Sequence, residues 1–230
     1  MGKTIGKEDS ASAARRGRDQ LEAALGELPI FPLAKVILYP RALLPLHIYE
    51  ERYRAMVKDC VETHGAMAIA LIAGDVDASG HPPISAIAGV GLIVEHQVLP
   101  DGRYNIVLQG SVRVRLEELP FVPPYRRAKA TILEDVPTVV TADNRTALLA
   151  AAHAFAGAVH KRDSNFSWHL PPGIEPATMA DLCAHHLVID ADARQAILEE
   201  LDVAERVERV TRELAMQQSA LLKESGGDLH

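Results

Sequence analysis

The chain has 230 residues and a formal net charge of −7, from 24 Lys and Arg against 31 Asp and Glu. Hydrophobic residues make up 48% of it and charged residues 24%, a globular composition that excludes disorder along the whole length. The acidic balance argues against a general binder of nucleic acids or anionic membranes, since both need a basic surface.

The chain predicts a soluble, cytoplasmic protein without a cofactor. Its two cysteines, Cys60 and Cys183, are too few and too far apart for a zinc ribbon or a disulfide framework. No apolar run reaches the ~18–20 residues of a membrane span. The first residues also lack the apolar core of a secretory signal.

Residues 1–27 form the first of three predicted segments. They contain glycines, alanines and mixed charges, and large apolar side chains are nearly absent before Leu21. Such a composition cannot bury enough apolar surface to fold alone. We expect disorder to about Ser12 and a weak helix from Arg16 to Leu25.

Residues 28–135 form the second segment, in which apolar residues mostly alternate with polar ones, as in strands. Strands are predicted at 36–38, 67–72, 90–98, 104–109, 112–116 and 127–133, with a helix inserted near 49–61. The turn at 100–102 has the Pro-Asp-Gly composition of a hairpin. The alternation places Val112, Val114 and Leu116 on one face and Arg113 and Arg115 on a polar outer face. Short strands joined by tight turns predict a small β barrel.

Residues 141–222 form the third segment, where the apolar spacing becomes helical. Four helices are expected, with Asp190 capping the third and Asp202 the fourth. The predicted class is therefore α+β, with a β-rich domain followed by a helical bundle. Leu221 and Leu222 could extend the last helix into a weak dimer contact, although packing within a monomer explains the same pattern.

Two groups of residues offer alternative functions. His185, His186 and Asp190 are the densest set of possible metal ligands, but they fall short of a closed site, and we predict no metal and no catalytic residue. Arg113, Arg115, Arg126, Arg127 and Lys129 form a basic cluster on predicted strands. A small barrel with such a cluster could bind RNA, whereas the acidic chain favours a solvated outer face.

Several segments in order resemble the N-terminal substrate-binding domain of the Lon ATP-dependent proteases. Leu28-Pro-Ile-Phe-Pro-Leu33 is similar to that family's first strand, and Leu44 to Tyr53 is similar to its "LPLxIFExRY" segment. The Leu99-Pro-Asp-Gly-Arg103 hairpin and the strand from Tyr125 also fit, and the resemblance runs from about Leu28 to Leu214. His47 and Tyr49 stand where the family often has Arg and Phe.

The resemblance implies a PUA-like barrel joined to a helical bundle. It implies a free-standing recognition domain that is not an enzyme, because the family's ATPase and protease modules have no counterpart in these residues. Its partners would be unfolded or apolar polypeptide segments, and a protease that it serves as an adaptor or scavenger. An RNA-binding module remains the alternative.

The residues that would contact a peptide lie in and after a proline-bounded apolar loop. The candidates are Tyr39, Leu43, Leu44, His47 and Tyr49. Leucines in so short a loop also commonly pack inward and close the end of a barrel. The sequence leaves that choice open.

Overall fold

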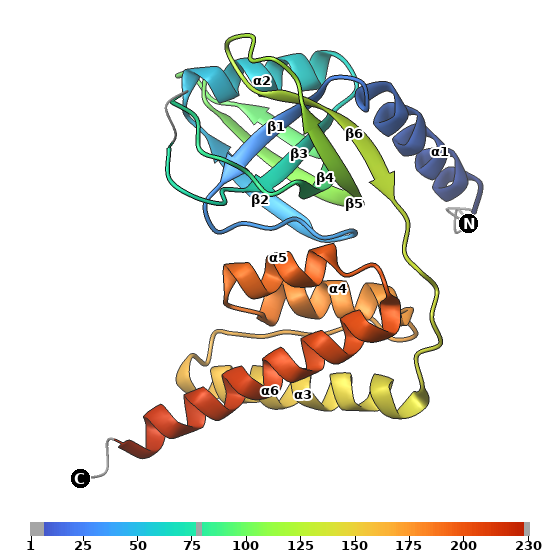
Figure 1. Cartoon of the computed structure of the whole chain (residues 1–230), viewed down its shortest axis with the longest axis vertical. Coiled ribbons are helices and arrows are strands. Elements are labelled where there is room, and N and C mark those ends of the chain that lie inside the picture. The colour runs from blue at the N-terminus through green and yellow to red at the C-terminus, as the bar shows by residue number, and fades with distance from the viewer. Residues whose placement is uncertain (1–6, 77–79, 228–230) are drawn as a thin grey trace, which may run out of the picture.

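The computed structural model describes residues 7–76 and 80–227. Figure 1 shows a strongly curved sheet at one end of the molecule and a group of helices at the other. The strands are β1 (Leu28–Leu33), β2 (Leu43–Ile48), β3 (Ala66–Leu71), β4 (Ile87–Val98), β5 (Tyr104–Glu118) and β6 (Arg127–Leu133). The helices are α1 (Lys7–Ala24), α2 (Glu51–Glu62), α3 (Ala142–Arg162), α4 (Pro176–Leu187), α5 (Ala191–Glu199) and α6 (Val203–Gly227). The α+β class is confirmed.

The strands follow the order β2-β5-β4-β3-β1-β6, and β5 pairs with β6 as well. The pairings therefore lead from β5 through four strands and back to β5. β5 pairs with three strands because it is long. One of its edges pairs with β4, and the other pairs with β2 at residues 104–109 and with β6 at residues 113–118. Irregularities in the β4–β5 register at Val90/Gly91 and Ile93/Glu95 allow the sheet to bend.

The two faces of β3 contribute to two separate hydrophobic clusters. Ala66, Ala68 and Ala70 join one, with side chains from the other strands and from α1. Met67, Ile69 and Leu71 join the larger one, which continues through α2 into the helices. Both faces of this strand are thus buried, as its unbroken apolar sequence requires.

The strand predicted at 36–38 is wrong. Ile37 and Leu38 are fully buried, but their segment crosses the sheet face without pairing into it. A Cβ atom on Gly89 would lie 1.8 Å from the Leu38 carbonyl oxygen, and one on Gly110 would lie 1.9 Å from that of Tyr39. The segment can lie so close because the strands beneath it carry glycine at these two positions.

The N-terminal helix is longer than predicted. The expected disorder reached Ser12, whereas α1 begins at Lys7, and residues 1–6 lie outside the described part of the chain. Leu21 and Ala24 are buried against the sheet, and the Leu25 carbonyl accepts a hydrogen bond from the Ala130 amide. Tertiary packing therefore supplies the stability that the local sequence lacks.

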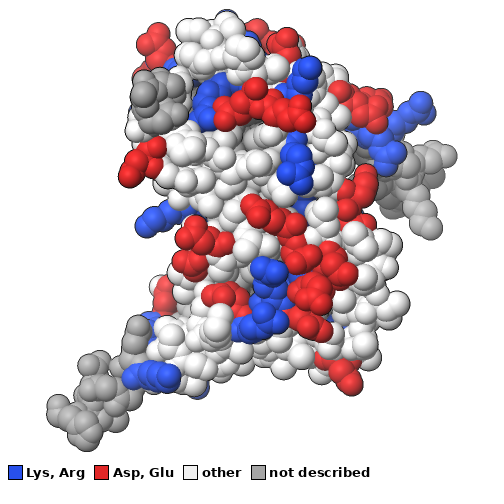
Figure 2. Space-filling view, viewed as in Figure 1, with Lys and Arg blue, Asp and Glu red and all other residues white. Residues whose placement is uncertain are grey.

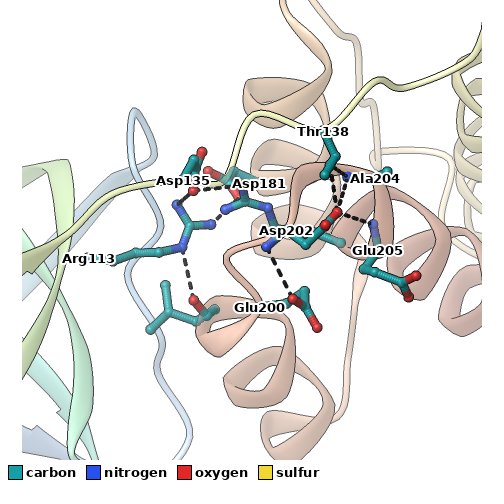
Figure 3. Close-up of polar contacts among 10 residues, drawn as sticks. Arg113, Asp135, Thr138, Asp181, Glu200, Asp202, Ala204 and Glu205 are labelled. Atoms are coloured by element: carbon teal, nitrogen blue, oxygen red, sulfur yellow. Dashed lines mark hydrogen bonds and ion pairs between the residues drawn. The ribbon is translucent and has the colours of Figure 1, made fainter.

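The helices α3 to α6 agree with the four predicted. The Thr141 side chain caps α3 and the Asp190 carboxylate caps α5. Asp202 accepts hydrogen bonds from the amides of Ala204 and Glu205 at the start of α6, as Figure 3 shows. Within the described residues, no helix is long and apolar enough to cross a membrane.

A buried ion-pair network joins the sheet to the helices (Figure 3). Arg113 on β5 and Arg206 on α6 both pair with Asp181 on α4 and with the more exposed Asp135, which follows β6. This corrects the prediction that Arg113 lies on a polar outer face. The helices cover this part of β5 and supply the carboxylates that a buried guanidinium requires.

Candidate functional site

An apolar cavity of about 320 Å³ lies between β1 and the end of β2. Its walls come from β1, from the end of β2 and the start of α2 that follows it, from the segment between β3 and β4, and from the loop between β5 and β6. Its apolar lining includes Phe31, Leu33, Leu46, Tyr53, Ile72 and Phe121. This volume suits one or two side chains of a ligand. We call it the β1–β2 cavity.

Aromatic rings shape two sides of the β1–β2 cavity. The rings of Phe31 and Tyr53 pack with their centroids 4.4 Å apart, and both side chains are nearly buried. Phe121 packs against the His81 ring at the same centroid distance but remains 46% exposed. Burial raises the pKa of the Tyr53 phenol, so this wall stays neutral at physiological pH. The cavity is thus suited to an apolar group.

The charged side chains at the rim are paired with other protein groups. Arg52 forms an ion pair with Glu50 at 2.8 Å and lies over the Tyr53 ring. Arg126 pairs with Glu118 at 2.6 Å and donates to the Pro82 carbonyl. Both arginines among the described residues of the rim are therefore already paired, and neither is free to draw an anionic ligand into the cavity.

The structure separates the five predicted peptide contacts into three groups. His47 and Tyr49 line the β1–β2 cavity, and Tyr49 is 65% exposed. Leu43 is also exposed and Leu44 is half-buried, but neither lines the cavity. Tyr39 is fully buried, and its hydroxyl donates to the Arg194 carbonyl at 2.6 Å. Tyr39 therefore reaches no surface ligand in this conformation.

The basic cluster does not form a continuous surface. Arg113 is buried in the ion-pair network, and Arg126 is paired with Glu118. Arg127 lies over the Tyr125 ring and donates to its hydroxyl. Figure 2 shows one face of the molecule, on which Lys and Arg side chains stand beside Asp and Glu instead of gathering into a basic area. Arg115 and Lys129 are exposed.

His185 and His186 are in ring contact with each other, and the Asp190 carboxylate accepts from the Ala193 amide. Over the described residues, no three His, Cys, Asp or Glu side chains are grouped so that they could hold a metal ion. Burial raises the pKa of the Cys60 and Cys183 thiols to about 12, so neither is a ready nucleophile.

The curved six-stranded sheet, the inserted helix α2 and the four C-terminal helices define an α+β domain with an apolar cavity beside β1 and β2. Residues 27–216 match the family model of the ATP-dependent protease La (LON) substrate-binding domain, and the chain belongs to that family.

The relatives and solved structures agree. The chain is 28% identical over 186 residues to the Lon protease of Dictyoglomus thermophilum and 26% identical over 204 residues to that of Escherichia coli K12. These alignments cover 80% and 85% of the chain but 24% and 25% of the two relatives, so the chain spans about a quarter of their length.

A Lon N-terminal domain protein from Xanthomonas campestris has the same fold, with a TM-score of 0.59 and 23% identity over 80% of this chain and 96% of that one. The N-terminal domain of a Mycobacterium avium complex Lon protease gives the same TM-score at 15% identity, covering 82% of this chain and 98% of that one.

Proposed function

We propose that the protein is a non-enzymatic module that recognises apolar side chains exposed by unfolded polypeptides. The β1–β2 cavity is the observation that carries the proposal, because it is apolar, lined by aromatic rings and bounded by charges that are already paired. An apolar group gains free energy on leaving water for such a cavity, at roughly 25 cal/mol per Å² of surface buried. Membership of the substrate-binding family supports the same role.

The role would be that of an adaptor or scavenger that hands unfolded chains to a protease in the cytoplasm. The match to relatives lies in their substrate-binding domain and covers about a quarter of their length, which supports a function in binding. The circuit of strand pairings that returns to β5 supports the PUA-like barrel that the resemblance implies.

The experiment that tests this function is binding of the purified protein to a fluorescent, permanently unfolded polypeptide, followed by anisotropy. A folded protein and a short RNA serve as the other ligands. We expect the protein to bind the unfolded polypeptide and to bind neither the folded protein nor the RNA. RNA binding that falls steeply with salt would instead support the RNA-binding alternative.

Two aspartate variants connect the binding to the cavity. Phe121→Asp places a charge in the cavity wall and should weaken binding more than tenfold, because the carboxylate would have to lose its water. Val139→Asp is the matched control, since Val139 is 88% exposed in the segment between β6 and α3. Equal binding by both variants would exclude the β1–β2 cavity as the site.

A further inference from the structure

One edge of β2 borders the β1–β2 cavity and has no strand beside it. Among the described residues, β2 pairs with β5 and with no other strand. The cavity touches Leu46, His47 and Ile48 of β2 on one side and residues 30–33 of β1 on the other. A gap that holds a cavity therefore separates the edge of β2 from β1.

The hydrogen bonds of β5 show which main-chain groups of β2 face this gap. The Gly110 amide donates to the Ala42 carbonyl at 2.8 Å, so even-numbered residues at this end of β2 face β5. On the other side of β5, the Leu99 amide donates to the Arg103 carbonyl, which places the odd-numbered residues of β5 toward β4. Both observations leave Leu43, Pro45 and His47 with their main-chain groups pointing away from the sheet.

Three of these main-chain groups have no backbone partner among the described residues. They are the carbonyl of Pro45 and the amide and carbonyl of His47, and of these two residues His47 lines the cavity. The Leu43 backbone interacts with His185 instead. Pro45 has no amide to offer, and its position fits the rule that proline occurs on the open side of an edge strand.

The side chain of His47 is held away from this edge. Its Nδ1 atom lies 2.7 Å from Asn105 Oδ1, and its Nε2 atom lies 3.2 Å from the Arg103 guanidinium. Both partners belong to the hairpin of β4 and β5, which lies on the opposite side of β2 from the gap. The imidazole therefore leaves the His47 amide and carbonyl accessible to a ligand.

We propose that an extended polypeptide segment adds to β2 as a new edge strand and places one apolar side chain in the β1–β2 cavity. This inference rests on the proposed function and specifies how the ligand is held. Side chains of an added strand alternate between its two faces. The ligand residue opposite Leu46 or Ile48 would enter the cavity, while the residue opposite His47 would point outward.

The occupant follows from the chemistry of this edge. Main-chain amides and carbonyls occur in every extended chain, so they provide binding that tolerates many sequences, and the cavity adds a requirement for an apolar residue. A folded protein has its main chain already paired and would not compete. Because Pro45 shortens the row of free groups, the edge binds one short segment and resists uncontrolled edge-to-edge pairing.

Two variants of one residue test the role of the main chain. His47→Pro removes the outward amide, and His47→Ala removes the same imidazole while keeping that amide. With a labelled decapeptide of Thr, Val and Lys residues around one Phe, we expect His47→Pro to bind about five- to tenfold more weakly than His47→Ala, the effect of one hydrogen bond. Equal affinity of the two folded variants would overturn the inference.

A second measurement uses the unaltered protein and does not depend on whether His47→Pro folds. Decapeptides that carry a single backbone N-methyl group at each position in turn should lose binding at alternate positions, because only every second amide faces β2. The His47 amide should also exchange its hydrogen more slowly when the peptide is bound. Binding that is indifferent to N-methylation would overturn strand addition and leave the proposed function standing, whereas no binding of any unfolded ligand would overturn both.

Discussion

Arg113 and Asp181 lie 68 residues apart in the sequence and meet as a buried ion pair between β5 and α4. Arg113 also donates from Nε to the Leu198 carbonyl of α5 at 2.9 Å, so a single side chain of the sheet binds two helices. Burial raises the pKa of the Asp181 carboxyl, and the guanidiniums of Arg113 and Arg206 oppose that rise. The pair fixes how the helices sit on the sheet.

Removing Arg113 should therefore destabilise the whole fold. Arg113→Ala leaves Asp181 buried with half of its positive partners gone, and such a change costs about 3–5 kcal/mol in the free energy of unfolding. Urea denaturation measures the loss. Arg115→Ala, two residues along the same strand but exposed, should change the stability by less than about 0.5 kcal/mol. Comparable losses in both variants would contradict this account of the network.

Glycine substitutions should have opposite effects at two sites. Gly110→Ala would place a Cβ atom 1.9 Å from the Tyr39 carbonyl oxygen, and we expect it to lower the unfolding free energy by about 3 kcal/mol. Gly157→Ala within α3 has no atom within 4 Å of the new Cβ and should raise stability by about 0.5–1 kcal/mol. Thermal and urea unfolding would show both. A stable Gly110→Ala variant would mean that the Leu38–Tyr39 segment does not press on the sheet.

Stability should fall in mild acid because of His185. Burial, with smaller contributions from His186 and Arg194, lowers the pKa of the His185 imidazole to about 4, below the value of about 6.5 for an unfolded chain. Between these pH values the unfolded state binds more protons, so stability rises with pH. The contribution is complete above pH 6.5 and is lost as the pH falls toward 4, amounting to about 3 kcal/mol.

The pH dependence can be assigned with one substitution. His185→Gln should flatten the dependence of the unfolding free energy between pH 4 and pH 6.5, as measured by urea denaturation across that range. His169→Gln is the control, because His169 is exposed. An unchanged slope in His185→Gln would assign the effect to other groups.

Within the proposed site, Tyr49 should matter more than Leu43. Both side chains are exposed apolar groups at the two ends of β2, but Tyr49 lines the β1–β2 cavity and Leu43 does not. We expect Tyr49→Ser to weaken binding of an unfolded polypeptide about tenfold, or 1.4 kcal/mol, and Leu43→Ser to leave it nearly unchanged. Anisotropy titrations decide between them, and the reverse order would move the site toward the helices.

Patterns in the sequence predicted the helices better than the strands, and they did not predict the site. The strands expected at 104–109 and 112–116 form the single strand β5, and the apolar loop expected around Leu43 and Leu44 is the start of β2. Local spacing predicts α2, the hairpin at 100–102 and the four C-terminal helices, since each depends on neighbouring residues. The buried run at 36–38 has the same composition as a strand, and nothing nearby in the sequence shows that it crosses the sheet. Arg113 alternates with apolar residues in the way an outward side chain does, until the helices cover it.

The β1–β2 cavity illustrates the same limit. His47 and Tyr49 belong to the segment that resembles the family, and both line the cavity. Phe31 and Phe121 lie 90 residues apart by number and meet there through the pairing of β1 with β6 and the loop that precedes β6. Each looks like an ordinary core or loop residue in the sequence. A contact between strands distant in sequence is the information that was missing.

The segment that crosses the sheet at Leu38 and Tyr39 also determines how many residues separate Tyr39 from the start of β2. Leu38 rests on the glycines of β4, and the Tyr39 hydroxyl reaches the Arg194 carbonyl of α5, while β2 begins four residues later. One added residue here would shift β2 by one position relative to β5. The main-chain groups of Leu43, Pro45 and His47 would then point toward β5 instead of away from it. The number of residues between Tyr39, which is hydrogen-bonded to the helices, and the start of β2 therefore determines which main-chain groups of β2 face a ligand.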